Sequence, residues 1–112
     1  MSMNETTLRG WYLISFTDAP PPKNRVLWGI IETDSRGLKP GSWVCSSLVI
    51  DQTDDKIFIT KNTCYTTQGL GDEISLPVKA LIELRQGVSP EEWQVYEDFR
   101  RQGYKIEIES GQ

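Results

Sequence analysis

The sequence predicts an α+β protein in which a twisted antiparallel sheet, or a small open β-barrel, of about five to six strands is packed by one or two short C-terminal helices. Three observations lead to this fold class. Apolar segments separated by turns rich in Pro, Gly and Asp occupy the first two thirds of the chain, and a helix-capping sequence follows near residue 89. The length of 112 residues, with 38% hydrophobic residues, suits a single domain over residues 1–112.

The N-terminal part is expected to contain two strands. Residues 1–9 are polar and expected to be flexible, whereas residues 11–16 are aromatic and branched, which is typical of a strand. Three prolines in residues 17–24 interrupt any sheet ladder and predict an exposed connector. Residues 25–33 form a nearly continuous apolar run and predict the second strand, in which Gly29 marks a bulge or a close backbone approach.

The middle of the chain is predicted to form a β-hairpin. Residues 42–51 and 56–61 are its two arms, and residues 63–67 continue the second arm. Cys45 and Cys64 lie in these arms, and the register of the turn leaves open whether they are close together. We expect two buried thiols, because two cysteines without histidine are too few ligands for zinc and a reducing compartment disfavours a disulfide.

Residues 68–73 are expected to form a flexible turn. Backbone amides around Gly69 and Gly71 would be able to cradle a phosphate, but Asp72 and Glu73 follow directly and would repel an anion. The sequence therefore gives no support for a phosphate site here.

Residues 77–86 are predicted to form a short helix. Val78, Leu81 and Ile82 recur at helical spacing, and the Pro at the start and the Gly after the end suit helix termini. The run Leu-Ile-Glu-Leu also alternates as a strand would, so the sequence leaves the strand open as an alternative.

A capping box marks the start of the second helix. Ser89 is followed by Pro90, and Glu92 lies three residues after the serine. Residues 104–109 then alternate between apolar and charged side chains, which predicts a half-exposed final strand. The helix carries three aromatic residues on one face, which we expect to pack against the sheet: Trp93, Tyr96 and Phe99.

Charge and composition exclude several functions. The 12 Lys and Arg residues against 16 Asp and Glu residues give a net charge of -4, which argues against a dedicated binder of nucleic acid or of an anionic membrane. The chain has no histidine, the commonest general base and metal ligand, so we expect no catalytic residues, no metal and no cofactor. No long apolar run and no apolar N-terminal leader occur, so we expect a cytoplasmic protein outside the membrane.

The aromatic residues are the candidates for binding. Trp43 follows a Pro-Gly turn, where a side chain can lie at the rim of a sheet, and polar residues share the predicted hairpin with it. The alternative is that the aromatic rings fill the core and the polar groups face water. The candidate ligand-binding residues are Trp43, Ser46, Ser47, Asn62 and Tyr65.

Part of the chain resembles a known family. The residues that carry the resemblance are Asp34-Ser35-x-Gly37, Gly41-x-Trp43-Val44-x-Ser46-Ser47-Leu48, Thr60-x-Asn62-Thr63-x-Tyr65 and Gly69-x-Gly71, within about residues 25–72. They resemble a domain of unknown function found in small phage-borne and mobile-element-borne proteins of proteobacteria. The resemblance implies a compact β-rich unit with an accessory role, and it implies no activity.

These observations lead to a non-enzymatic protein-binding module that acts on a protein partner or associates with itself. We expect docking at the edge of the final strand, with Tyr104, Ile106 and Ile108 at the interface. One alternative is a small-molecule-binding β-barrel whose pocket is lined by Trp43 and Tyr65. A less favoured alternative is a binder of single-stranded nucleic acid, with exposed aromatic rings that stack on bases.

Overall fold

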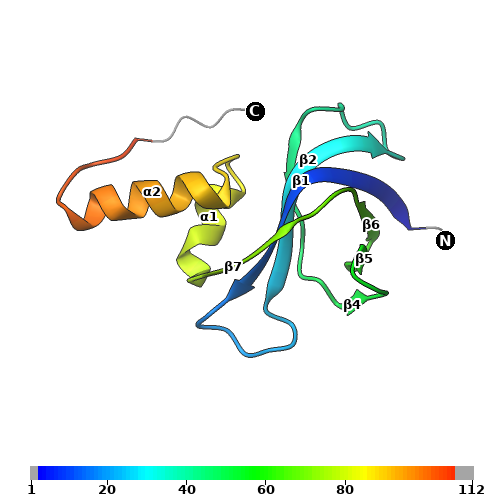
Figure 1. Ribbon diagram of the computed structural model, residues 1–112, viewed down its shortest axis with the longest axis horizontal. Helices are drawn as coiled ribbons and strands as arrows, with labels where there is room; N and C mark the ends of the chain where they lie inside the picture. The colour runs from blue at the N-terminus through cyan, green and yellow to red at the C-terminus, as the bar shows by residue number, and fades with distance from the viewer. Residues whose placement is uncertain (1–2, 108–112) are drawn as a thin grey trace.

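The computed structural model describes residues 3–107, and within them seven strands precede three short helices (Figure 1). The strands are β1 (Asn4–Phe16), β2 (Arg25–Asp34), β3 (Trp43–Cys45), β4 (Asp51–Gln52), β5 (Ile57–Ile59), β6 (Thr63–Thr67) and β7 (Asp72–Leu76). The helices are the 3-10 helix η1 (Val78–Ala80) and the α-helices α1 (Leu81–Leu84) and α2 (Pro90–Arg101).

All seven strands belong to one open sheet with β1 at its centre. The order is β3-β2-β1-β6-β5-β4, and β7 also pairs with β1. The pairs β1–β6 and β1–β7 are parallel, and all other neighbouring strands are antiparallel. β6 pairs with Asn4 to Leu8 of β1, and β7 pairs with Tyr12 to Phe16 on the same edge. The predicted α+β class with a mostly antiparallel, unclosed sheet is confirmed.

The segment between β3 and β4 makes the sheet curl. The backbone N–H of Val49 donates to the carbonyl of Arg25 in β2, and the next N–H, that of Ile50, donates to Ile59 in β5. Two successive residues thus bond to strands that lie far apart in the sheet order. The two halves of the sheet therefore enclose a space between them.

The predicted third strand over residues 42–51 is wrong in its length, because the chain leaves regular pairing after Cys45. The side-chain hydroxyl of Ser46 accepts the Leu27 N–H at 2.8 Å and so takes a position that a backbone carbonyl fills in a regular ladder. Cys45 pairs with Trp28 in β3–β2, whereas Cys64 pairs with Ile59 in β6–β5, and both thiols are free. The two cysteines are therefore not cross-strand partners.

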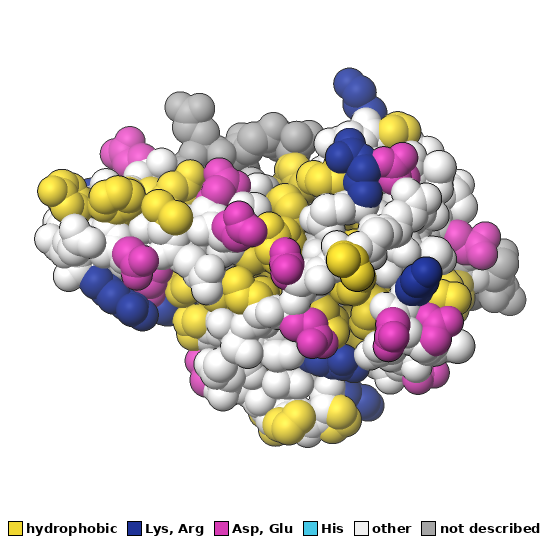
Figure 2. All heavy atoms as spheres, viewed as in Figure 1, with side chains coloured by type: hydrophobic (Ala, Val, Ile, Leu, Met, Phe, Trp, Pro, Cys, Tyr) yellow, Lys and Arg dark blue, Asp and Glu magenta, His cyan; other side chains and the backbone are white. Residues whose placement is uncertain are grey.

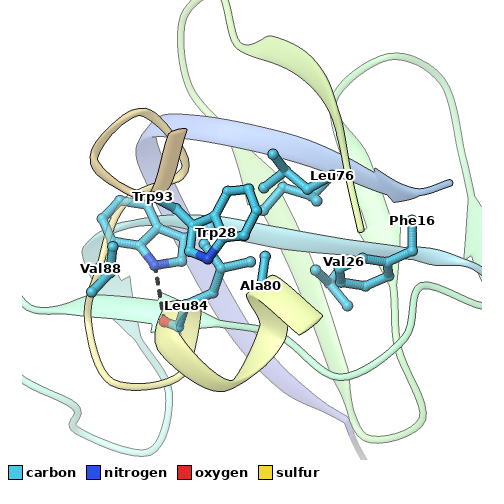
Figure 3. Packing of buried hydrophobic residues seen from close by; sticks show 9 residues of the cluster. Phe16, Val26, Trp28, Leu76, Ala80, Leu84, Val88 and Trp93 are labelled. Carbon is cyan, nitrogen blue, oxygen red and sulfur yellow. Dashed lines mark hydrogen bonds between the residues drawn. The ribbon is translucent and has the colours of Figure 1, made fainter. Parts of the chain in front are cut away.

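Each face of β1 and β2 carries its own hydrophobic cluster, because successive side chains of a strand point to opposite faces. The inner cluster lies within the curl of the sheet and consists of Leu8, Trp11, Leu13, Leu27, Ile31, Val49, Phe58 and Tyr65. The helix-side cluster lies beneath the helices and consists of Ile14, Phe16, Val26, Trp28, Leu76, Ala80, Leu84, Val88 and Trp93 (Figure 3).

A bulge at Gly10 brings Leu8 and Trp11 onto the same face of β1. The two residues are an odd number of positions apart, which in a regular strand places side chains on opposite faces. Gly10 has a positive φ of 52°, and the β1–β2 register shifts between Arg9 and Tyr12. Gly29 of β2 lies beneath this pair, where an added Cβ would be 3.2 Å from Trp11 Cβ and 3.3 Å from Leu8. The predicted close backbone approach at Gly29 is confirmed.

The helices cover one face of the sheet, as Figure 1 shows. Trp28 donates its indole N–H to the Leu84 carbonyl at 3.3 Å (Figure 3), and Trp93 donates to the Glu83 carboxylate at 3.0 Å. Arg100 pairs with the same carboxylate at 2.5 Å, so α2 is fastened to α1 by two of its side chains. The predicted helix within residues 77–86 is confirmed over Val78 to Leu84.

The second predicted helix is confirmed together with its capping box. The Ser89 hydroxyl accepts the Glu92 N–H at 3.2 Å, and the Glu92 carboxylate accepts the Ser89 N–H at 3.0 Å. Trp93 is buried and Tyr96 is half-buried against the helix-side cluster. The prediction that Phe99 also packs against the sheet is wrong, because this side chain remains 43% exposed beyond the edge of the cluster.

Three other sequence-based predictions are wrong. Residues 1–9 were expected to be flexible, but from Asn4 onward they form β1, where Thr6 and Leu8 are buried. The predicted final strand over residues 104–109 is absent from residues 104–107, because no strand of the sheet pairs with this segment. Residues 108 and 109 lie outside the described residues. The turn expected at residues 68–73 ends at Asp72, where β7 begins.

Candidate functional site at the edge of β7

The structure places Trp43 and Tyr65, the two aromatic candidates, in different clusters. Trp43 is half-buried against the helix-side cluster and lies next to Gly87, whose added Cβ would be 2.9 Å from the indole nitrogen. Tyr65 is buried in the inner cluster, and Arg36 lies close to its ring hydroxyl. The two rings therefore do not line one pocket together.

The polar candidates are also dispersed. Ser46 is buried and holds the Leu27 N–H, and its own hydroxyl donates to the Ser47 carbonyl at 2.7 Å. Ser47 is exposed on the segment that follows. Asn62 is exposed in the turn before β6, where its carbonyl accepts the Asn4 N–H. The structure thus uses Ser46 and Asn62 to hold the sheet together.

The predicted interface residues lie after α2. Tyr104 is 61% exposed and packs edge-on against Phe99, with ring centroids 5.7 Å apart. Ile106 is half-buried, and Ile108 lies outside the described residues. Without a strand over residues 104–107, this segment does not offer the strand edge that the sequence predicts.

A different strand edge is exposed, that of β7. Thr17 donates its backbone N–H to the Leu76 carbonyl at 3.0 Å, which fixes which backbone groups of β7 face β1. Because backbone groups of successive residues point to opposite sides of a strand, those of Ile74 and Leu76 face β1. Those of Glu73 and Ser75 point away, and within residues 3–107 no backbone hydrogen bond of the fold uses them.

The first of two hollows beside this edge opens between β7 and the β4–β5 hairpin. Its volume is about 370 Å³, within the range of known ligand clefts. We call it the Trp11 hollow. Its floor is apolar and comes from the inner cluster, with Trp11, Leu13 and Phe58, and its rim carries Gln52, Asp55, Lys56, Gly69, Leu70, Gly71 and Glu73.

The Trp11 ring is held in place from three sides. Its indole N–H donates to the Gly69 carbonyl at 3.2 Å, and the Phe58 ring lies 5.7 Å away at a tilt of 55°. Gly71 lies against the fused bond of the indole, where an added Cβ would be 2.2 Å from Trp11 Cε2. The next residue towards the tip of this loop, Leu70, is fully exposed.

The second hollow opens on the other face of the sheet, between β7 and α2. Its volume is about 440 Å³, and we call it the α2 hollow. Its lining residues are more polar than those of the Trp11 hollow: Ser75, Leu76, Pro77, Trp93, Gln94, Glu97, Asp98 and Arg101. Glu97 is buried here and forms an ion pair with Lys79, which lies 6.0 Å from the centre of the Trp93 ring.

Acidic side chains dominate the surroundings of β7. Figure 2 shows them spread over the middle of the face where β7 runs in Figure 1. Burial raises the pKa of the Tyr12 hydroxyl to about 12, and the nearby carboxylates of Glu91 and Asp72 contribute to the same shift. A cation is therefore favoured at this edge of the sheet, and an anion is disfavoured.

Two further titratable residues lie away from the edge of β7. Asp34 accepts hydrogen bonds from Thr6 at 2.5 Å and from the Arg36 guanidinium at 2.9 Å, which ties the end of β2 to β1. Burial raises the pKa of the Cys45 thiol to about 11, against the influence of the neighbouring Arg85, so this thiol is protonated at neutral pH.

Within the described part of the chain, no three His, Cys, Asp or Glu side chains come close enough to hold a metal ion. None of the helices in residues 3–107 has the length and hydropathy needed to cross a bilayer.

The sequence contains one signal that predicts β7, although the glycines before it favour a turn. Ile74 and Leu76 alternate with Glu73 and Ser75, which is the period of a strand with one buried face. The two glycines just before this run draw attention to a turn instead. Nothing in the sequence alone indicates that Trp11 lies beside it, because these contacts join residues about sixty positions apart.

Comparison with known proteins identifies one family. A family model described as a domain of unknown function, DUF6957, matches residues 26–83, which is slightly more than half of the chain. The matched segment runs from β2 to α1 and includes β7. No curated protein and no solved structure matches the chain. The chain belongs to the DUF6957 family of domains of unknown function.

Proposed function

We propose that the protein is a non-enzymatic protein-binding module that captures an extended segment of a partner as an additional strand on β7. The observation that supports this is the outer edge of β7, where the backbone groups of Glu73 and Ser75 point away from the sheet. Strand addition satisfies such groups through main-chain hydrogen bonds, and flanking pockets select the side chains. The edge lies between two hollows, one on each face of the sheet.

We place this role in an accessory protein of a phage or other mobile genetic element that acts in the cytoplasm. The support for a mobile element is the resemblance of residues 25–72 to small proteins that such elements carry. The support for the cytoplasm is that Cys45 and Cys64 are free thiols, since disulfides are rare there. The absence of histidine from the sequence supports a role without catalysis.

A proline at position 75 tests strand addition directly. The Ser75 N–H points away from β1, so Ser75→Pro removes an outward donor and places a ring on the edge without breaking a β1–β7 hydrogen bond. The matched control is Ser75→Ala, which keeps the N–H. Peptides that bind the wild type or either variant are selected from a random-peptide library. Fluorescence polarisation then measures the affinity of each protein for the enriched peptides.

The expected result is binding by the wild type and Ser75→Ala and its loss in Ser75→Pro. Urea unfolding of each variant shows whether the fold is kept. Enriched peptides that bind all three proteins equally would contradict strand addition at β7. Failure of the wild type to enrich any peptide would contradict the proposed function as a whole.

A second function is favoured by the Trp11 hollow, which would hold a small molecule on its aromatic floor. A thermal-shift screen against metabolites and nucleotides tests it. The expected result is a rise of several degrees in the melting temperature with a ligand. This rise should be lost in Lys56→Glu on the rim and kept in Ser75→Pro. A gain lost in Ser75→Pro and kept in Lys56→Glu would argue against this second function.

A further inference from the structure

Resting on the proposed strand addition, we infer the side-chain pattern of the partner. The added segment carries a large apolar side chain that enters the Trp11 hollow and a Lys or Arg side chain that reaches the α2 hollow. The two residues are an odd number of positions apart. The partner is thus a basic, extended peptide segment with one apolar anchor.

The odd spacing follows from where the hollows lie along β7. Glu73 lines the Trp11 hollow and is the register partner of Leu13, whose side chain belongs to the inner cluster. Leu76 lines the α2 hollow and belongs to the helix-side cluster on the opposite face. Successive side chains of an added strand alternate between these faces, so only residues an odd number apart reach both hollows.

The apolar anchor follows from the composition of the Trp11 hollow. Trp11, Leu13 and Phe58 form its floor, and their rings and methyl groups offer few polar atoms to a ligand. Leu70 on the rim is fully exposed, which leaves a large apolar side chain in water at the mouth of the hollow. Because the floor residues are already nearly buried, an apolar side chain of a partner would gain most by covering Leu70 and the part of Trp11 that is still accessible.

The cationic residue follows from the charges around the second hollow. Glu97 is already paired with Lys79, whereas Asp98 is exposed and forms no ion pair within residues 3–107. Arg101 lies in the same lining and opposes this field in part. Asp72 and Glu73 on the strand itself add two exposed carboxylates, so acidic groups outnumber basic ones beside the α2 hollow and a cation gains more there than an anion.

The same charges favour a different partner over a second copy of this chain. Each copy has a net charge of -4 and would bring its own Asp72 and Glu73 to a β7–β7 contact. Like charges opposite each other destabilise a strand pair, whereas a basic segment complements the edge.

Designed peptides test this pattern. The reference is a capped, fluorescein-labelled peptide of Thr and Val with one Leu and one Lys three positions apart. Three controls replace the Lys by Glu, replace the Leu by Ser, or move the Lys by one position so that both residues share a face. Fluorescence polarisation measures affinity, and the backbone amide signals of Glu73 and Ser75 in nitrogen-15-labelled protein report whether the peptide adds to β7.

We expect the reference peptide to bind most tightly and to shift both amide signals. The Glu peptide should bind about tenfold more weakly, because the change removes an attraction and adds a repulsion. The Asp98→Lys variant should reduce this preference, since Asp98 is exposed on α2 and its exchange leaves the helix contacts intact.

The outcomes separate the partner pattern from the proposed function. Equal binding by all four peptides, with both amide signals shifted, would overturn the pattern and leave strand addition standing. Signals that no peptide shifts would overturn strand addition itself. Light scattering that shows dimers, with the same two signals changing on dilution, would replace the basic partner by a second copy.

Discussion

Gly71 lies so close to Trp11 that a Cβ at position 71 would be 2.2 Å from the indole ring. The contact closes the loop between β6 and β7 over the ring, and the Trp11 N–H fixes the same loop through the Gly69 carbonyl. This arrangement lets the chain leave the edge of β1 after β6 and return to it as β7. The candidate site therefore depends on one small residue at its rim.

Gly71→Ala should destabilise the protein by about 1–3 kcal/mol, because the methyl group forces the indole or the loop to move. The free energy of unfolding in urea measures the effect. The double variant with Trp11→Phe is the control, since the smaller ring leaves room for the methyl group. Additive effects of the two substitutions would contradict the clash as the cause.

Ser89→Ala should cost about 1 kcal/mol, because it leaves the Glu92 N–H at the start of α2 without its acceptor. Urea unfolding is again the measurement, and Ser75→Ala on the exposed edge of β7 is the matched control. Equal stability of the two variants would mean that the capping box contributes nothing measurable.

Asp34→Asn should weaken the dependence of stability on pH. Burial raises the pKa of Asp34, but hydrogen bonds from Arg36, from Thr6 and from the Leu38 and Arg36 backbone outweigh burial and hold the pKa well below its usual range. A carboxyl whose pKa is lowered on folding stabilises the fold above its unfolded pKa of about 3.9, and this contribution is lost as the pH falls further.

The stability difference between the wild type and Asp34→Asn should therefore be largest near neutral pH and shrink below about pH 4. Urea unfolding between neutral and acid pH measures it. Asp55→Asn, on the exposed turn between β4 and β5, is the control and should have little effect on stability because its side chain is exposed. A difference for Asp34→Asn that stays constant with pH would show that its charge does not matter.

Cys45 should resist alkylation in the folded protein. With its pKa raised to about 11 by burial, the thiolate fraction at mildly alkaline pH is on the order of a hundredfold lower than for an ordinary thiol. Iodoacetamide labelling followed by peptide mass spectrometry measures the rate, and the same residue in urea is its own control. Equal rates in folded and unfolded protein would contradict the protection of this half-buried thiol.

Local signals in the sequence predict the parts of the fold that depend on local contacts. The Ser89–Glu92 capping box needs only four consecutive residues, and both of its hydrogen bonds form. The apolar run of residues 25–33 likewise indicates a strand buried on both faces, and β2 contributes to both clusters. These features can be predicted because residues close together in the sequence determine them.

Long-range pairing decides the parts that the sequence does not reveal. The polar start of β1 becomes a central strand because β2 and β6 lie on its two sides, and Thr6 satisfies its hydroxyl with Asp34. Residues 104–107 alternate as a strand does, yet no strand pairs with them. The same limit applies to the site, because Trp11, Phe58 and Gly71 meet only when the sheet curls.

The position of β1 has a consequence for the choice of fragments of this family for expression. The segment that matches the family begins at residue 26, after β1 has ended. A fragment that starts there would expose the apolar side chains of β2 to water and would lack the strand with which β2, β6 and β7 pair. Recombinant versions should retain the N-terminal strand, since the autonomous folding unit extends beyond the recognisable homology.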